Sequence, residues 1–316
     1  MSEIKPRIVV VGSHAPGIAV RVKRIPAAGE TVIGWDLQES KDGGKGSNQA
    51  IAAARLGVST SFVGCIGKDG LGAECENMLR AEGVDISHLY HSESKGTGAG
   101  IIIVDEDGVP AMVTSLGANE ELTGQQVEAA LQEYEEAQVM LTQFEIRPEV
   151  ALHAARFARR YHMITIVNPA PASPASLPDL EAADVLVPNE VEAKMMLGHE
   201  PGAQTDLETV AQILLTRTRA GRVVITAGEQ GIVGADGSGV WRSLPPKVTV
   251  VDTSGAGDVF CAALAAGLTK GLDHRAASIW ACSVAALSVT KEGTIPSFPT
   301  AAEVAEFNMS QPMPHP

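Results

Sequence analysis

One short stretch combines a turn suited to anion binding with a carboxylate. Residues 250–260 read VVDTSGAGDVF and open a long helix-like run. The Gly-Ala-Gly turn would present free backbone N–H groups at a helix N-terminus, where the helix dipole favours an anion. Asp258 falls in the first turn of that helix, and a second carboxylate, Asp252, lies six residues upstream. A lone aspartate there is usually a terminal carboxylate that the dipole favours. Beside this turn, however, we expect Asp258 to be a general base next to a bound phosphate.

A second glycine-rich stretch, DGGKGSNQA at residues 42–50, raises the question of a phosphate loop. A Walker A loop needs G-x-x-x-x-G-K-[ST], so that a hydroxyl reaches the magnesium ion. Its first glycine would fall on Glu39, and Gly46 follows the lysine, so both requirements fail. What remains is a turn that lets a ligand approach the backbone closely. Good helix formers follow from Asn48 to Leu56, and Gly57 is a typical C-cap. The stretch predicts a site for a small polar ligand.

Composition and charge narrow the class of protein. The chain has 316 residues, 45% of them hydrophobic, which is enough for one large α/β domain or two smaller ones. Its net charge of −14 argues against a nucleic-acid surface or an anionic membrane. The cysteines form no C-x-x-C pair, so we expect buried, reduced thiols and a cytoplasmic protein. They are Cys65, Cys75, Cys261 and Cys282. The N-terminal sequence predicts no signal peptide, and no stretch predicts a membrane-spanning segment.

Strand-like apolar runs alternate with helical patterns along most of the chain. This alternation predicts an α/β fold with a mostly parallel sheet and helices on both faces. The predicted strands are Ile8–Val11, Thr60–Cys65, Val139–Gln143, Ile164–Asn168, Val185–Pro188 and Arg222–Thr226. The predicted helices include Leu71–Glu82, Thr123–Ala137, Pro148–Tyr161 and Leu207–Ala220.

Two regions break this alternation. Residues 21–39 and 98–115 alternate like antiparallel strands, and the second region contains a DEDG turn. We predict a small separate sheet, built from about residues 18–40 and 97–115, that stands as a lid over one end of the main sheet. We expect residues 1–316 to form a single domain that includes this lid, with a flexible tail at residues 311–316.

The order of these motifs resembles that of the ribokinase, or PfkB, family of sugar and nucleoside kinases. GGKGSNQA is similar to the first signature of the family and DTSGAGDVF to the second, which is the more specific. VPNEVE matches the family's N-x-x-E motif at Asn189 and Glu192, and residues 224–231, VITAGEQG, match the stretch beside the nucleotide. The resemblance covers residues 8–299. It implies a three-layer α/β/α fold with a mostly parallel central sheet and a small antiparallel β lid.

The resemblance implies an ATP-dependent kinase that phosphorylates a hydroxymethyl group of a small sugar. Asp258 would be the general base, and an anion hole would stabilise the transferring phosphoryl group. The hole would consist of the N–H groups of Gly255, Ala256 and Gly257. The GGKG loop then becomes a sugar clamp, because these side chains and the backbone supply the donors and acceptors that a polyol needs. The substrate-binding residues would be Gly43, Gly44, Lys45, Asn48, Glu145 and Asp258.

The same resemblance assigns the nucleotide and the metal ions. The nucleotide-binding residues would be Asn189, Thr226, Gly228, Gly231 and Gly257. Asn189 and Glu192 would hold Mg²⁺ through water, because magnesium keeps much of its hydration shell. A monovalent cation, K⁺, would bind beside the anion hole. Its residues would be Asp252, Ser254, Ser288, Lys291, Gly293 and Ser297. The alternative is that Asp252 caps a turn and residues 291–293 form an ordinary loop.

One departure from the family pattern concerns the sugar. Family members usually carry G-x-x-N-x-D after the first strand, where the Asn and the Asp bind sugar hydroxyls, whereas residues 12–17 read GSHAPG. Ala15 and Gly17 therefore replace the two polar residues. A hydroxyl contact with a carboxylate contributes about 1.5–3 kcal/mol, so ribose itself is in doubt. The alternatives are a substrate without a hydroxyl there, a bulkier substrate, or a substitute contact from His14.

Two further functions stay open. A nucleoside kinase on the same scaffold agrees with the altered sugar motif. A non-catalytic sugar-binding regulator would need no base, so the retained Asp258 argues against it. A nicotinamide-binding enzyme is disfavoured, because GSHAPG lacks the G-x-G-x-x-G spacing. Open lid edges can pair with another chain, and related kinases often bury them by dimerising, so we expect a homodimer.

Overall fold

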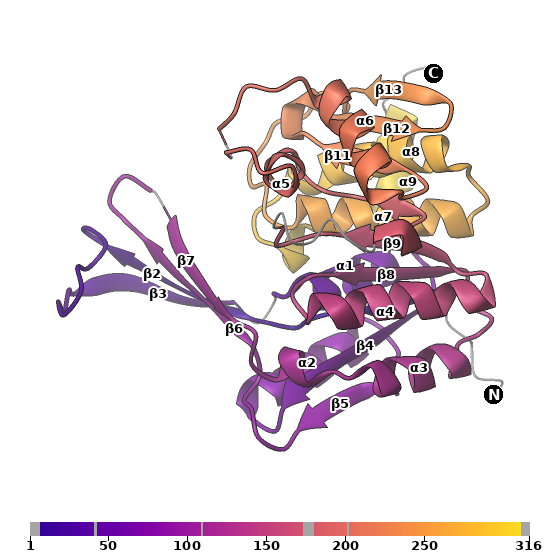
Figure 1. The fold of residues 1–316 in the computed structure, drawn as a ribbon. Coiled ribbons are helices and arrows are strands. Elements are labelled where there is room, and N and C mark those ends of the chain that lie inside the picture. Colours follow the sequence, from indigo (N-terminus) through magenta and orange to yellow (C-terminus); the bar gives the residue numbers. More distant parts are fainter. Residues whose placement is uncertain (1–6, 41–42, 109, 173–179, 201, 311–316) are drawn as a thin grey trace.

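The main sheet of the protein is long and mostly parallel. The computed structural model describes residues 7–40, 43–108, 110–172, 180–200 and 202–310. The main-sheet strands within them are β1 Ile8–Val11, β4 Thr60–Gly67, β5 Leu89–Ser92, β8 Val139–Gln143, β9 Ile164–Asn168, β10 Val185–Leu186, β11 Val223–Thr226, β12 Ile232–Asp236 and β13 Gly239–Ser243. Their order is β13-β12-β11-β10-β9-β8-β1-β4-β5 (Figure 1). Neighbours are parallel from β11 to β5, whereas β12 and β13 are antiparallel at one edge.

Helices cover both faces of this sheet, because its strands contribute to two hydrophobic cores. In β1, Val9 and Val11 face one core, and Ile8 and Val10 face the other. The helices of the first face are α3 Gly124–Glu133, α4 Pro148–Ala158, α5 Glu190–Met196 and α6 Leu207–Thr218. Those of the second face are α1 Lys45–Arg55, α2 Gly70–Ala81, α7 Ala256–Thr269, α8 His274–Ser288 and α9 Ala301–Ser310. The predicted three-layer arrangement is confirmed.

The predicted strands and helices of this layer are present, with ends that differ by a few residues. β10 ends at Leu186, two residues before the predicted end, because the chain turns there into the N-cap of α5. α1 begins at Lys45, three residues earlier than predicted, which places the lysine in the first helical turn. The apolar pattern does not predict β5, β12 and β13. β5 and β13 are short edge strands whose side chains are mostly half-exposed, so their pattern is weak.

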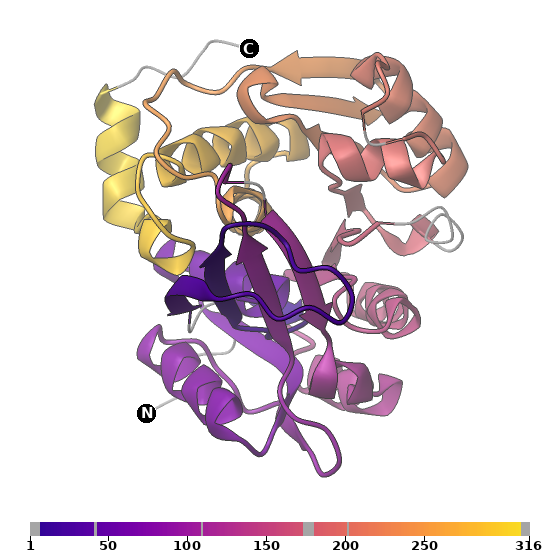
Figure 2. The ribbon, with the colours of Figure 1, turned by 90° about the vertical axis from the view of Figure 1, so that its left-hand side faces the viewer.

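A second, smaller sheet stands apart from the main one and corresponds to the predicted lid. Its strands are β2 Gly17–Val22, β3 Gly34–Ser40, β6 Ala99–Val104 and β7 Pro110–Ser115, in the order β3-β2-β6-β7. β2 with β3, and β6 with β7, form antiparallel pairs, and the central pair β2 with β6 is parallel. The sheet projects from the main body in Figure 1 and crosses in front of it in Figure 2.

The lid exposes large apolar side chains. Ile33 is 91% exposed, and Trp35, Leu37, Ile101 and Val113 are also exposed. Ile101 lies opposite Val113 in register and opposite Ile18 on its other side. Residues directly opposite each other in a sheet share a face, so part of this apolar surface is continuous. No helix of the described chain packs against the lid (Figures 1 and 2).

All four cysteines are buried, and none forms a disulfide, in agreement with the expectation of reduced thiols. Among the described residues, no helix has the length and apolar character needed to cross a membrane. The tail predicted at residues 311–316 lies outside the described residues.

Candidate active site

The predicted anion hole lies at the N-terminus of α7. Gly255 caps this helix with a φ of 74°, a left-handed conformation that favours glycine. A Cβ at Gly255 would lie 2.6 Å from the Phe298 ring, whereas a Cβ at Gly257 would meet nothing within 4 Å. The N–H of Ala256 donates to the carbonyl of Thr253 at 3.2 Å, so an anion would compete with that carbonyl for this donor. The helix end is otherwise open and suits an anion.

Asp258 is buried in the first turn of α7 and is only 7% exposed. Asn48 Nδ2 donates to its Oδ2 and Gln49 Nε2 donates to its Oδ1, both at 3.0 Å. Burial raises the pKa of Asp258 above its ordinary value, while the charge of Lys45 and the two amide hydrogen bonds oppose that rise. A buried carboxylate that binds a proton more tightly than a free aspartate is suited to general-base work.

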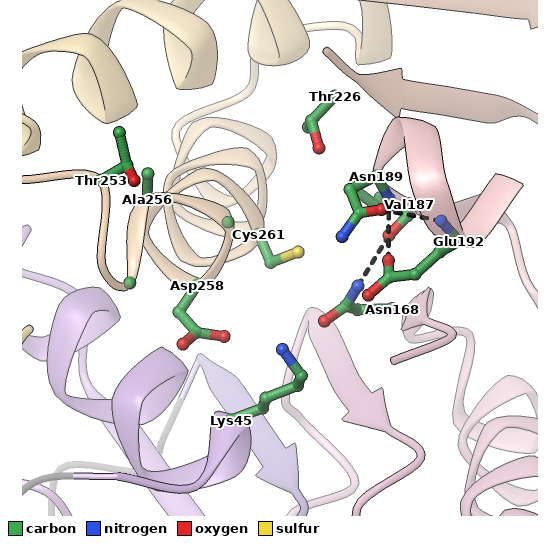
Figure 3. A pocket seen from close by; sticks show the side chains of 12 residues that line it. Lys45, Asn168, Val187, Asn189, Glu192, Thr226, Thr253, Ala256, Asp258 and Cys261 are labelled. Carbon is green, nitrogen blue, oxygen red and sulfur yellow. Dashed lines mark hydrogen bonds between the residues drawn. The ribbon is translucent and has the colours of Figure 1, made fainter. Parts of the chain in front are cut away.

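Lys45 brings a fixed positive charge into the same space. It is the first residue of α1, and its ammonium points into the pocket that the Asp258 carboxylate also faces (Figure 3). Burial works to lower the pKa of Lys45, but the negative charges of Asp258, Glu145 and Glu192 outweigh it and raise the pKa. The lysine therefore stays protonated at neutral pH.

The GGKG loop packs directly against the segment that follows β1. A Cβ at Gly43 would lie 2.3 Å from the carbonyl oxygen of Ala15, so only glycine permits this approach. Glu145, which follows β8, joins the two segments. Its Oε2 accepts from Ser13 Oγ at 2.6 Å and from Lys45 N at 2.8 Å. The fold thus gathers the predicted substrate-binding residues at the N-terminus of α1.

A pocket of about 170 Å³ opens between these elements (Figure 3). The turn before α7 forms one side, and the C-terminal ends of β9 and β11 with the start of α5 form the other. Ligands of open α/β sheets usually bind at the carboxyl ends of the strands. The lining residues are Lys45, Asn168, Val187, Asn189, Glu192, Thr226, Thr253, Gly255, Ala256, Gly257, Asp258 and Cys261.

Asn189 and Glu192 line this pocket and also cap α5. Asn189 Oδ1 accepts from the backbone N–H of Glu192, and Glu192 Oε2 accepts from that of Asn189, both at 2.8 Å. This reciprocal pair is a capping box, which the N-x-x-E spacing allows. Burial raises the pKa of Glu192, whereas the hydrogen bond from the Asn189 N–H and the charge of Lys45 act to lower it. The cap uses only one carboxylate oxygen, so the other can serve a ligand.

The predicted nucleotide-binding residues form the neighbouring wall. Thr226 ends β11 and lines the pocket, and its N–H donates to the carbonyl of Pro188 at 3.0 Å. Gly228 and Gly231 lie in the turn that follows, with φ values of 54° and 78°. They do not line the pocket itself, but they follow directly after Thr226, which does. This turn is closed by the Ala227 N–H, which donates to the Gly231 carbonyl at 2.8 Å.

The predicted cation residues come together where the loop before α7 meets the end of α8 and the segment that follows it. Asp252 accepts from Ser254 N through Oδ1 and from Gly293 N through Oδ2, both at 2.9 Å. These hydrogen bonds lower the pKa of Asp252, that from Ser254 most strongly. The Ser288 and Ser297 hydroxyls donate to nearby carbonyls, and the Lys291 ammonium pairs with Glu303. Asp252 therefore ties the loop before α7 to the segment after α8.

The segment that departs from the family pattern offers no polar side chain at its two altered positions. Ala15 is buried against the GGKG loop, and Gly17 begins β2 opposite Gly100 of β6. The His14 ring is 1% exposed, its Nδ1 lies 3.0 Å from Ser47 Oγ, and burial lowers its pKa to about 4. These contacts favour a packing role for His14 over a contact with substrate.

Polar residues of this site that sequence reasoning missed include Ser13, Gln49, Asn168 and Thr253. Gln49 directly follows the predicted Asn48, and Asn168 ends the predicted strand Ile164–Asn168. A polar residue at the carboxyl end of a buried strand is a usable signal. Which polar side chains converge on Asp258 depends on how β1, β8, β9 and α1 pack, and the chain order does not contain that information.

The fold and the pocket together define a class of enzyme. A buried carboxylate, a charged lysine and an open helix N-terminus converge at the carboxyl edge of a mostly parallel sheet (Figure 3). Phosphoryl transfer needs little covalent work from a protein beyond positioning and charge stabilisation. The arrangement is that of a phosphotransferase acting on a hydroxyl group.

Comparison with known proteins identifies the family. Residues 5–301 match the profile described as pfkB family carbohydrate kinase, and the chain belongs to this family. The ribokinase of Bacillus subtilis is 36% identical over 303 residues, which cover 95% of this chain and 98% of that one. The ribokinase structure of Thermotoga maritima superposes with a TM-score of 0.85 at 31% identity, covering 96% and 99% of the two chains. The ribokinase structure of Arabidopsis thaliana, complexed with ribose and ATP, superposes with a TM-score of 0.84 at 28% identity and the same coverage. The family and fold that the motifs predict are confirmed.

Proposed function

We propose that the chain transfers a phosphoryl group from ATP to a hydroxymethyl group of a small sugar, with Asp258 as the general base. The observation that carries this proposal is the buried Asp258 carboxylate, held by two amides beside the open N-terminus of α7. The ribokinase relatives, and the Arabidopsis structure with ribose and ATP, support a sugar acceptor and ATP as the donor.

The proposed step balances with one proton transfer. The hydroxymethyl oxygen attacks the γ-phosphorus, the bond from that phosphorus to the bridging oxygen breaks, and Asp258 takes the hydroxyl proton. Lys45 and the N–H groups of residues 255–257 stabilise charge on the phosphoryl oxygens. Thr253 gives up its hydrogen bond from Ala256 at this point.

The donor set at the start of α5 fits Mg²⁺. Glu192 has a carboxylate oxygen outside the capping box, and the Asn189 side chain lies beside it in the pocket. Hard cations prefer such oxygen ligands, and magnesium keeps several waters. Mg²⁺, when bound, neutralises charge on the phosphate oxygens. We propose that Asn189 and Glu192 hold it through water.

The two loops around Asp252 fit a monovalent cation. The carboxylate ties residues 252–254 to Gly293, and Val289 accepts from the N–H of Val251 at 2.8 Å. Carbonyl and hydroxyl oxygens of residues 254, 288, 291, 293 and 297 would complete a site for K⁺. We expect the rate to rise several-fold, about 1 kcal/mol in activation free energy, when K⁺ replaces a bulky organic cation, and an equal rate in both would contradict the proposal.

The acceptor site has polar groups on one side only. Lys45, Asn48, Glu145 and Asp258 can bind hydroxyls, whereas residues 15–17 carry no side-chain donor or acceptor. A sugar that lacks hydroxyls at its lid end, or that carries a bulky group there, loses no hydrogen bonds to the side chains of residues 15–17. We therefore propose a deoxy or substituted sugar as the preferred acceptor, and a nucleoside is the alternative.

The lid is the proposed dimer interface. Its apolar face includes Leu37, Ile101 and Val113, and its outer strands β3 and β7 have open edges. We propose that a second copy of the chain covers this face, that residues 1–316 act as a single kinase domain, and that the enzyme is cytoplasmic.

The test is ADP release with Mg-ATP and K⁺. The panel contains ribose, deoxyribose, ketohexoses, tetroses, polyols and nucleosides, with Asp258→Asn assayed alongside. Turnover of a sugar that disappears in the variant supports the proposal. Turnover of nucleosides alone selects the nucleoside kinase, and sugar binding by calorimetry without any turnover selects the regulator.

A further inference from the structure

A chain of buried amide side chains lies behind Asp258. Gln49 Nε2 donates to Asp258 Oδ1 at 3.0 Å and to Asn168 Oδ1 at 3.3 Å, and Gln49 Oε1 accepts from Gln143 Nε2 at 2.6 Å. Asn168 Nδ2 donates in turn to the carbonyl of Val187 at 2.8 Å. Gln143, Gln49 and Asn168, here called the amide chain, thus connect the ends of β8 and β9 with the proposed base.

The chemistry at its two ends fixes the direction of the amide chain. An ionised carboxylate and a backbone carbonyl can only accept, so Gln49 and Asn168 must turn their NH₂ groups toward Asp258 and Val187. Gln49 then presents its oxygen to Gln143. An N–H donor forms a stronger hydrogen bond to an ionised carboxylate than to a neutral carboxyl group. The amide chain therefore favours the state of Asp258 that can take a proton.

Gln49 and Gln143 do not line the pocket, so a packing explanation must be considered. Both are 0% exposed, where an amide costs free energy unless it is hydrogen-bonded, and an apolar side chain of similar length would pack without that cost. Gln143 Oε1 has no hydrogen-bond partner among the described residues. A Cβ at Gly12 would lie 2.1 Å from that oxygen, so glycine makes room for Gln143. Packing alone does not account for two glutamines here.

We propose that Gln49 is a positioning residue for the phosphoryl transfer, which holds the Asp258 carboxylate oriented and unprotonated toward the acceptor hydroxyl, with Gln143 in support. This inference rests on the proposed role of Asp258 as the base. Four other charged or titratable groups face Asp258 from the surrounding elements: Lys45, Glu145, Glu192 and Cys261. They remain in place when Gln49 is changed, so the contribution of Gln49 can be measured separately.

The variant Gln49→Met keeps the length and burial of the side chain and removes its hydrogen bonds. We expect kcat to fall about 10- to 100-fold, the range for a hydrogen bond to a charged group, with the sugar KM changed less than about threefold. The acid limb of the kcat profile moves to higher pH, because the lost NH₂ donor had favoured the ionised carboxylate. Gln143→Met should lower kcat and move the acid limb in the same direction, by a smaller amount.

Thr142→Val is the matched control. The Thr142 hydroxyl is buried next to Gln143 and has no hydrogen-bond partner among the described residues, so we expect its loss to leave kcat and the pH profile unchanged.

A second readout does not depend on turnover. The Asp258 carboxyl carbon is followed by NMR in ¹³C-aspartate-labelled protein and assigned by its loss in Asp258→Asn. We expect its titration midpoint to be higher in Gln49→Met than in the unchanged protein. If no acceptor is turned over, the proposed function fails while this titration still tests Gln49. If Gln49→Met does not fold, Gln49→Glu replaces it, and we expect a larger upward shift because a second carboxyl group then adjoins Asp258. An unchanged titration midpoint, or a raised KM with unchanged kcat, overturns the inference.

Discussion

The centre around Asp258 and the lid are stabilised in opposite ways, although both border the proposed sugar site. Asp258 and Gln49 are buried, and hydrogen bonds within one chain hold them in place. The lid is a sheet with exposed apolar side chains, of which Leu37 is 66% exposed, and no helix of the described chain covers it (Figures 1 and 2). The side chains around Asp258 are hydrogen-bonded within the folded chain, whereas the apolar side chains of the lid are exposed to solvent.

This difference has a physical basis in the two interactions involved. A buried carboxylate must have its hydrogen bonds in place in the folded chain, because an unsatisfied charge is costly. Apolar area can stay exposed until a partner arrives, and burial then stabilises the complex by about 25 cal/mol per Å². Changes near Asp258 should therefore affect the rate, and changes in the lid should affect association and substrate binding.

The largest effect is expected for Asp258→Asn. The amide cannot accept the hydroxyl proton, so kcat should fall about 1,000-fold or more while the sugar still binds. Steady-state ADP release and calorimetry measure the two quantities. Asp273→Asn is the matched control, because Asp273 caps α8 and asparagine caps a helix equally well. Substantial activity in Asp258→Asn would remove the base from the proposed centre.

A pair of glycine substitutions separates the effect of the anion-hole backbone on stability from the effect of free space in the anion hole on the rate. Gly255→Ala should lower the free energy of unfolding by about 2–3 kcal/mol, because the methyl group meets Phe298 at a left-handed backbone. Gly257→Ala should leave stability unchanged or raise it by up to about 1 kcal/mol, since alanine favours helices. Its methyl group faces open space in the pocket, so kcat should still fall about tenfold, or about 1.4 kcal/mol. Denaturant unfolding and kinetics test both, and equal stability of the two variants would contradict the packing argument.

The pH dependence should differ between the centre and the lid. The pKa of Asp258 is raised by burial, so kcat should fall about tenfold per pH unit below a midpoint above 3.8, the ordinary value. The native state binds this proton more tightly than the unfolded state. The stability that Asp258 contributes is therefore full below about pH 3.8 and is lost as the pH rises through the folded pKa.

The pKa of Glu30, in the lid, shifts in the opposite direction to that of Asp258. The hydrogen bond from Arg24 lowers its pKa to about 2, and the pair is exposed. The stability that Glu30 contributes is therefore present above its pKa in the unfolded chain, and it is lost as the pH falls through about 2. A kcat profile between pH 4 and 8 and unfolding curves between about pH 2 and 8, with Asp258→Asn for comparison, test this contrast. An acid midpoint that is the same for wild type and Asp258→Asn would assign the acid limb to another group.

The smallest effect on chemistry is expected in the lid. Leu37→Lys places a charge on the apolar face and should convert a dimer to a monomer, raise the sugar KM about tenfold, or about 1.4 kcal/mol, and leave kcat within about twofold. Light scattering at micromolar concentration and steady-state kinetics measure these changes. Met309→Lys is the control, because Met309 is also highly exposed but lies on α9, away from the lid. A wild-type chain that is monomeric at that concentration would contradict the dimer.

Much of the architecture follows from local patterns. Ile8–Val11 and Val139–Gln143 are fully buried strands, and a continuous apolar run signals such strands without further information. The lid is visible as two segments that lose the helical period. The parallel pairing of β2 with β6 is not visible, because these strands lie about 80 residues apart and only the folded chain brings them together.

The sequence alone determined the motif at residues 255–258, the glycine-rich loop at 42–46 and the loss of polar side chains at Ala15 and Gly17. Each depends on residue type and short spacing, which local backbone chemistry interprets directly. The tertiary structure decided that Gln49 contacts both Asp258 and Asn168, that Glu192 caps α5 while facing the pocket, and that His14 packs against Ser47. These contacts join residues from different strands and helices, and the packing of the two cores, not the spacing along the chain, sets the distances between them.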